Sequence, residues 1–105
     1  MLLVTTECIE GRKIEKVFGL VRGNTIRARH LGRDVMAGLR NIVGGEIKDY
    51  TRMLTQARDQ AIERMVKEAE GLGANAVVGV RFTTSQTMSS AAEILAYGTG
   101  VRLKE

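Results

Sequence analysis

The sequence has 105 residues and a formal net charge of +4 at neutral pH, from 16 basic and 12 acidic side chains. This length fits one domain, residues 1–105. The core is expected to be aliphatic, because the sequence contains no Trp and only two Phe and two Tyr. A single cysteine excludes an intrachain disulfide, and neither a leader peptide nor an apolar run of ~18–20 residues is present, so we expect a cytoplasmic protein without a membrane span.

The first third of the chain predicts strands. Residues 2–6 form a short strand, and residues 14–21 form a second strand whose poor alternation indicates that both faces are covered. Gly23 and Asn24 are a turn signal. Residues 25–29 are expected to continue the strand beyond that turn.

The chain is organised around a long amphipathic helix that begins after Gly44 and Gly45. Its apolar stripe recurs at spacings of three and four residues, which places on one helix face Ile47, Tyr50, Leu54, Ala57, Ala61, Met65, Ala69 and Leu72. The alanines have little bulk, so the covering surface can approach closely, and a sheet is the expected partner. A short helix over residues 34–43, with Asp34 as N-cap, is expected before it.

The last third predicts two further strands. Residues 76–83 alternate, with Ala76, Val78, Val80 and Phe82 on one apolar face, and Gly79 indicates a bulge or a close backbone neighbour. Residues 84–90 are small and polar and predict a loop or hairpin turn. Residues 94–103 predict the last strand.

The order of elements predicts an α+β fold with a mainly antiparallel sheet and one long helix packed across one face. The last strand carries Ala96, Gly98 and Gly100 on one of its faces. Such a flat face lets another element or another subunit approach closely. Together with the thin core, it favours association of the chain with copies of itself.

Metal ligands are few in this sequence. Cys8 carries the only thiol and His30 the only imidazole, and the spacings of closed zinc sites are missing. A metal ion is therefore a candidate cofactor only if carboxylates complete the site or if the site is shared between subunits. The alternative is that Cys8 is a small apolar side chain and His30 a loop residue.

Acid–base chemistry has one candidate pair on the long helix. Glu46 and Tyr50 are four residues apart, so they share a helix face, and a carboxylate with a phenol can transfer protons. Gly44 and Gly45 resemble a phosphate cradle, but the acidic Glu46 and Asp49 would repel a phosphate. The alternative role of these residues is to start the helix.

Basic residues gather in the first half of the chain, between Arg22 and Arg33. No aromatic residue is interleaved between residues 21 and 40, so base stacking is not expected there. A solvated loop, or arginines paired with an acidic neighbouring subunit, fits this cluster better than nucleic-acid binding.

Four segments, TTECIEGRKI, IVGGEIKDYTRML, GLGANAVVGVRF and EILAYGTGV, resemble the YbjQ-type family of uncharacterised proteins, which carries a heavy-metal-binding label. The resemblance runs nearly end to end and implies a dodecin-like subunit fold that assembles as a closed homopentamer. Two positions depart from the family pattern, since Gly100 stands where alanine is expected and Cys8 stands where no shared ligand is expected.

The resemblance implies a self-assembling binding or scaffold protein of unknown molecular function, with a ligand or ion at its subunit boundaries. Its motifs place the candidate ligand-binding residues at Gly45, Glu46, Tyr50, Tyr97 and Thr99. The alternatives are a metal-binding protein with a site shared between subunits and an enzyme that uses Glu46 and Tyr50.

Overall fold

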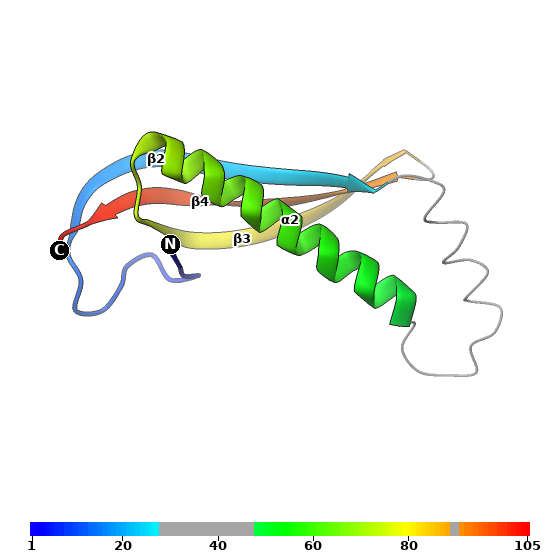
Figure 1. Cartoon of the computed structure of the whole chain (residues 1–105), viewed down its shortest axis with the longest axis horizontal. Coiled ribbons are helices and arrows are strands. Elements are labelled where there is room, and N and C mark those ends of the chain that lie inside the picture. The colour runs from blue at the N-terminus through cyan, green and yellow to red at the C-terminus, as the bar shows by residue number, and fades with distance from the viewer. Residues whose placement is uncertain (28–47, 89–90) are drawn as a thin grey trace.

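The computed structural model describes residues 1–27, 48–88 and 91–105 (Figure 1). Its elements in chain order are β1 (Leu2–Leu3), β2 (Ile14–Arg27), α2 (Lys48–Leu72), β3 (Ala76–Met88) and β4 (Ala91–Leu103). The strands form a four-stranded sheet in the order β1-β3-β4-β2. The β2–β4 and β3–β4 pairs are antiparallel and the β1–β3 pair is parallel, so the sheet is mixed.

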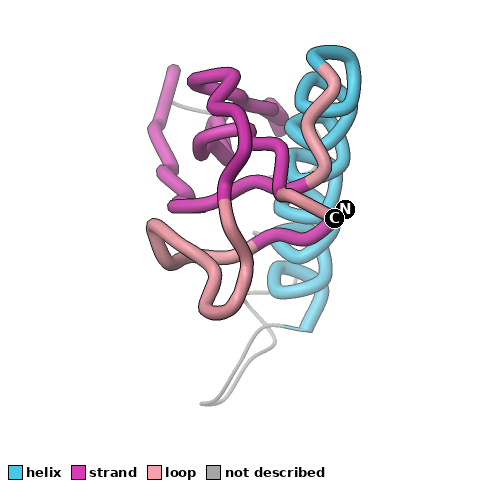
Figure 2. Tube along the Cα trace, turned by 90° about the vertical axis from the view of Figure 1, so that its left-hand side faces the viewer, coloured by secondary structure: helices cyan, strands magenta, loops and turns pink. Residues whose placement is uncertain are grey.

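The predicted α+β class and the long helix across one face of the sheet are confirmed (Figures 1 and 2). The short helix predicted over residues 34–43 lies outside the described residues. Within the described residues, no helix has the length and apolar character needed to cross a membrane.

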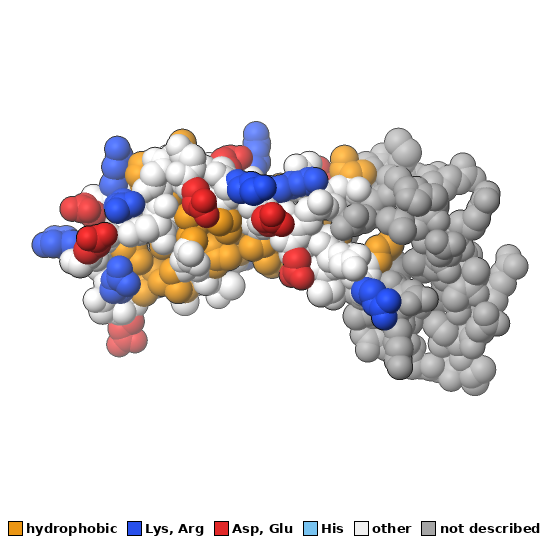
Figure 3. Space-filling view, in the orientation of Figure 1, with side chains coloured by type: hydrophobic (Ala, Val, Ile, Leu, Met, Phe, Trp, Pro, Cys, Tyr) orange, Lys and Arg blue, Asp and Glu red, His pale blue; other side chains and the backbone are white. Residues whose placement is uncertain are grey.

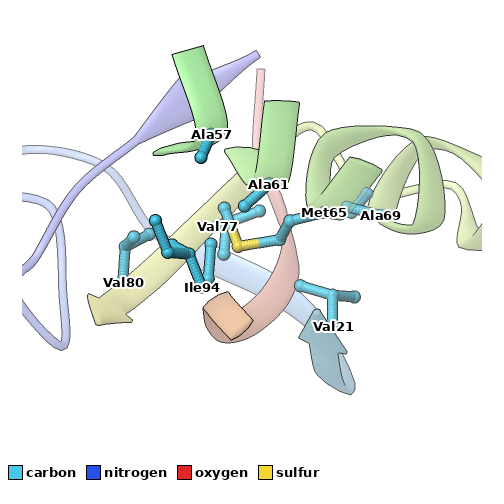
Figure 4. Close-up of a cluster of buried hydrophobic side chains, with 10 residues drawn as sticks. Val21, Ala57, Ala61, Met65, Ala69, Val77, Val80 and Ile94 are labelled. Carbon is cyan, nitrogen blue, oxygen red and sulfur yellow. The ribbon is translucent and has the colours of Figure 1, made fainter. Parts of the chain in front are cut away.

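Helix α2 packs mainly on β2 and β4. Ala57, Ala61, Met65 and Ala69 are fully buried against the sheet, where they meet side chains such as Val21 (Figure 4). The predicted apolar stripe is therefore confirmed over these turns. Its last member, Leu72, is 46% exposed instead, because the helix ends at that residue and the chain then turns toward β3.

The turn predicted at Gly23 and Asn24 is wrong, since both residues lie inside the continuous strand β2. Gly23 faces α2, and a Cβ at this position would collide with the helix backbone at Ala61 and Met65. Glycine is thus required here for close packing of helix on strand, and not for a reversal of the chain.

A bulge at Gly79 changes which side chains of β3 face the helix. Gly79 has a φ of 62°, and the pairing with β4 shifts register between Val78 and Arg81. The predicted bulge is confirmed, but the predicted common apolar face is wrong. Val77 and Val80 lie in the core under α2, whereas Val78 lies in a second core on the opposite face.

The loop or hairpin turn predicted over residues 84–90 has bounds that are too wide. β3 continues to Met88, and β4 begins at Ala91, so the two strands form a long hairpin. Residues 84–86 are polar and exposed but pair with residues 92–94 of β4. Their hydrophilic character marks a solvent-exposed strand end, which a search for apolar alternation does not detect.

The N-terminal segment covers part of the sheet face that α2 leaves free. The second core, formed by Ala76, Val78, Val101 and Leu103, is covered by Val4, Ile9 and Ile14. Backbone hydrogen bonds attach this segment to β3, including Val4 N to Val77 O at 3.0 Å and Gly79 N to Thr6 O at 2.8 Å. The predicted strand over residues 2–6 is therefore shorter, with β1 limited to Leu2–Leu3.

The Ala96, Gly98 and Gly100 face of β4 is buried inside the subunit. A Cβ at Gly98 would lie 2.7 Å from Val77 Cγ1, and one at Gly100 would lie 3.1 Å from Val21 Cγ1. The close neighbour expected from the sequence is therefore an element of the same chain. This face is not available to a second subunit.

Gly23→Ala is expected to lower the free energy of unfolding by about 1–3 kcal/mol, because the added methyl forces the helix away from β2. The matched control is Gly71→Ala, which adds a methyl where nothing lies within 4 Å, inside the helix. It should raise the stability by about 0.5–1 kcal/mol. Urea denaturation followed by circular dichroism at one protein concentration measures both, and equal effects would contradict the packing argument.

Thr25 has a buried hydroxyl, 2% exposed, for which no hydrogen-bond partner exists among the described residues. Thr25→Val should raise the free energy of unfolding by about 1 kcal/mol, because it removes an unsatisfied polar atom and keeps the shape. Thr25→Ser keeps the hydroxyl and loses a methyl group, so it should lower stability by about 0.8 kcal/mol. A Val variant no more stable than wild type in the same denaturation experiment would show that the hydroxyl is satisfied in solution.

Candidate functional site

The sheet face opposite α2 is open where the N-terminal segment ends. Strand register places a set of neighbouring side chains on this open face, which we define as Leu20, Arg22, Asn24, Ile26, Arg81, Thr83, Ser85, Glu93, Leu95, Tyr97 and Thr99. The residues between them on β2 and β4, such as Val21 and Ala96, are buried under the helix. The open face therefore gathers the polar and charged side chains of three strands on one surface.

Tyr97 lies at the centre of this face, on β4. It pairs with Arg22 on β2 and with Arg81 on β3, so the three side chains form a row across three strands, which we call the Tyr97 row. Directly opposed residues of an antiparallel pair have Cβ atoms about 4.5–5.5 Å apart. Tyr97 is half-buried, whereas Arg22 and Arg81 are exposed.

The guanidinium of Arg81 is held by backbone carbonyls. Its Nη1 donates to Thr5 O at 2.8 Å and to Val80 O at 2.9 Å. The N-terminal segment thus fixes one cationic end of the Tyr97 row. Among the described residues, no carboxylate lies within salt-bridge distance of Arg22 or Arg81.

The far end of the open face is acidic and already hydrogen-bonded. Asn24 Nδ2 donates to Glu93 Oε2 at 3.0 Å, which joins β2 and β4. Arg64 of the helix donates from Nη1 to Asn24 O at 2.6 Å, so α2 also holds this position of β2.

The open face also carries exposed apolar side chains on β2. Leu20 is 61% exposed and Ile26 is 57% exposed.

The structure brings together two of the residues predicted from the sequence motifs, because Tyr97 and Thr99 share the open face on β4. Tyr50 lies in the first turn of α2. Gly45, Glu46 and His30 lie outside the described residues, so the pairing of Glu46 with Tyr50 stays a prediction.

Sequence reasoning did not assign Arg22 and Arg81 to this site. Arg22 was visible as part of the basic cluster between Arg22 and Arg33, and it lies exposed on β2. Arg81 was hidden by the bulge at Gly79, which changes the face that each later residue of β3 occupies. Strand pairing is the signal that would have joined them to Tyr97.

Cys8 is exposed in the loop between β1 and β2, and Thr6 Oγ1 donates to its carbonyl oxygen at 2.6 Å. The part of the chain that the structure describes contains no group of three His, Cys, Asp or Glu side chains able to hold a metal ion. The described residues of a single chain therefore do not fit a metal centre at Cys8.

Comparison with solved structures supports the fold. A crystal structure of a protein of unknown function from Pediococcus pentosaceus, in the DUF74 family, matches with a TM-score of 0.66. The alignment covers 99% of this chain and 98% of that chain, at 18% sequence identity. The similarity in fold therefore extends over nearly the whole chain.

Sequence comparison identifies close relatives. UPF0145 proteins from Archaeoglobus fulgidus and Halorubrum lacusprofundi are each 60% identical over 104 residues, with 99% of this chain and 96% and 100% of theirs covered. The UPF0145 protein of Colwellia psychrerythraea is 57% identical over the full length of both chains. The sequence model of the YbjQ family, described as "Putative heavy-metal-binding", matches residues 1–104. The chain therefore belongs to the YbjQ family of uncharacterised UPF0145 proteins.

Proposed function

We propose that this chain is the subunit of a homopentameric ring that holds a small ligand or ion where copies meet. The observation that carries the proposal is the apolar surface of β2, the edge strand of the sheet. Val17, Leu20 and Ile26 are 57–61% exposed along this strand. Burial of such side chains against another copy is favourable by about 25 cal/mol for each square ångström removed from water.

The backbone of β2 supports the same proposal. This strand is 14 residues long, and no strand of the described residues pairs with its outer edge. Long edge strands with exposed apolar side chains pair readily with other chains unless charges, proline or a covering element block them. Contact between copies would cover this edge.

A second apolar surface lies on the helix side of the sheet. Because α2 covers β2 and β4 more than β3, Phe82 of β3 remains 46% exposed beside the helix. Leu72, the last residue of α2, is also 46% exposed. Figure 3 shows hydrophobic side chains beside the helix, on the face that the view presents. Two different apolar surfaces on one subunit suit a head-to-tail contact, which closes into a ring when the rotation between copies permits.

Leu20→Glu is expected to convert the assembly to monomers, because it places a charge where the proposal buries an apolar side chain. Native mass spectrometry of untagged protein should give a pentameric ion for wild type and a monomeric ion for this variant. Gln56→Glu makes the control, since it adds one negative charge at an exposed position of α2 and should leave the pentamer intact.

A monomeric wild-type protein at micromolar concentration would contradict the assembly itself. A pentameric Leu20→Glu variant would instead show that the contact does not use this part of β2. Any mass in excess of five chains would give the mass of the bound ligand. That mass would distinguish a bound metal ion from an organic molecule.

The description of the family favours a second candidate, a metal ion in a site shared between copies. Cys8 is exposed and so is accessible to a second chain, and His30 is the other ligand that this candidate uses. Protein purified without chelator should then lose its metal content, measured by elemental mass spectrometry, when Cys8 and His30 are both replaced by alanine. Unchanged metal content in the double variant would remove this candidate.

A further inference from the structure

We propose that the Tyr97 row, formed by Arg22, Tyr97 and Arg81, binds a small organic oxyanion. Its ligand would carry a phosphate or carboxylate group, recognised by the guanidinium groups, on a planar ring that packs against Tyr97. The inference rests on the proposed binding role and names the chemical class of ligand that the open face accepts.

Geometry is the first support. The register of two strand pairs places Arg22 and Arg81 on either side of Tyr97, on the same face of the sheet. The N-terminal segment packs over the second core around Val78 and Val101 and contacts the row at Arg81, through Thr5 O. Arg22 and Arg81 nevertheless remain exposed, and Tyr97 is half-buried. A ligand can therefore approach all three side chains from solvent.

Charge is the second support. Each guanidinium carries five N–H donors in a planar fork, which suits the paired oxygens of a carboxylate or phosphate. Arg81 donates from Nη1 to the carbonyls of Thr5 and Val80, which fixes its position, and no described residue accepts a hydrogen bond from its Nε or Nη2. No carboxylate of the described residues compensates Arg22 or Arg81, so an oxyanion would supply the missing negative charge.

The neighbours of the row define the rest of the ligand. Thr99 follows Tyr97 on the same face of β4 and pairs with Leu20, which is 61% exposed. Leu95 precedes Tyr97 on that face and is half-buried. An aromatic ring with apolar neighbours favours a planar body stacked or packed beside the anionic group.

The size of the ligand is limited by Glu93. This carboxylate lies on the same face of β4, four residues from Tyr97, about 13 Å away at ~3.3 Å per residue. Its negative charge opposes extension of a polyanion along the strand. The open face also presents a single aromatic ring, whereas single-stranded nucleic acids are held by successive stacked bases. These observations favour a small molecule over a nucleic acid.

Isothermal titration calorimetry of the full chain at low ionic strength tests the proposal, with AMP and benzoate as probes that pair an oxyanion with a ring. Adenosine supplies the ring alone and inorganic phosphate the anion alone. We expect AMP or benzoate to bind, adenosine not to bind, and Arg22→Gln to weaken binding by roughly ten-fold or more. Arg22 donates no side-chain hydrogen bond to any described residue, so its replacement should leave the fold intact.

Arg58→Gln is the matched control, because it removes one positive charge from an exposed position of α2. This variant should bind like wild type. Equal weakening by Arg22→Gln and Arg58→Gln would overturn the site in favour of general charge attraction. Failure of both AMP and benzoate to bind at millimolar concentration would overturn it as well. Stronger binding of an RNA oligonucleotide than of AMP, with the same sensitivity to Arg22→Gln, would assign the row to nucleic acid and overturn the small ligand.

The outcome is separable from that of the proposed assembly. Native mass spectrometry of the Arg22→Gln variant should give the same subunit number as wild type, because the row does not include the apolar side chains of β2. Val17 is also exposed on β2, pairs with Val101 and is not a neighbour of the Tyr97 row, so Val17→Glu tests assembly without changing the anion site. If a monomeric Val17→Glu variant still binds AMP or benzoate as wild type does, the anion site stands and its placement at a subunit boundary is wrong. If wild type is pentameric and binds neither probe, the assembly stands and the anion site is overturned.

Discussion

Close packing of α2 on β2 and β4 is the contact on which the rest of this fold depends. Alanines line the helix face, and Gly23 lets the strand meet the helix backbone directly. With few aromatic side chains in the sequence, the core gains its contacts by short distances between elements and not by large side chains. The helix therefore buries one face of β2 and β4 in the core.

Burial of this face leaves the opposite face of the strands as the one whose side chains can reach solvent. The opposite face of the same strands cannot be covered by α2, and the N-terminal segment packs on it around Val78, Val101 and Leu103 and contacts Arg81 through Thr5 O. Polar and cationic side chains occupy the remainder, with Tyr97 between two arginines. The helix and the sheet thus give β2 and β4 one buried face, packed closely through small residues, and one open face that carries the Tyr97 row.

The proposed assembly would use the edge strand of the same sheet. β2 contributes Gly23 to the core, Arg22 to the Tyr97 row and Leu20 to the exposed apolar surface. Alternation along the strand places Gly23 on the face under the helix, whereas Leu20 and Arg22 share the open face. If copies of the chain meet along β2, the proposed anion site borders the contact, and assembly and binding would share a strand.

The sequence by itself determined the α+β class, the long helix with its buried stripe and the alternation of β4, because each depends on local periodicity. Two of the candidate residues, Tyr97 and Thr99, share a face for the same reason. The sequence offered the bulge at Gly79 as one of two alternatives, because glycine in a strand accompanies either a bulge or a close backbone neighbour. Only the tertiary structure decided that Gly23 meets a helix and makes no turn, and that Arg81 joins Arg22 beside Tyr97. These outcomes depend on register between distant strands and on which element covers which face, and neither is encoded in the spacing of neighbouring residues.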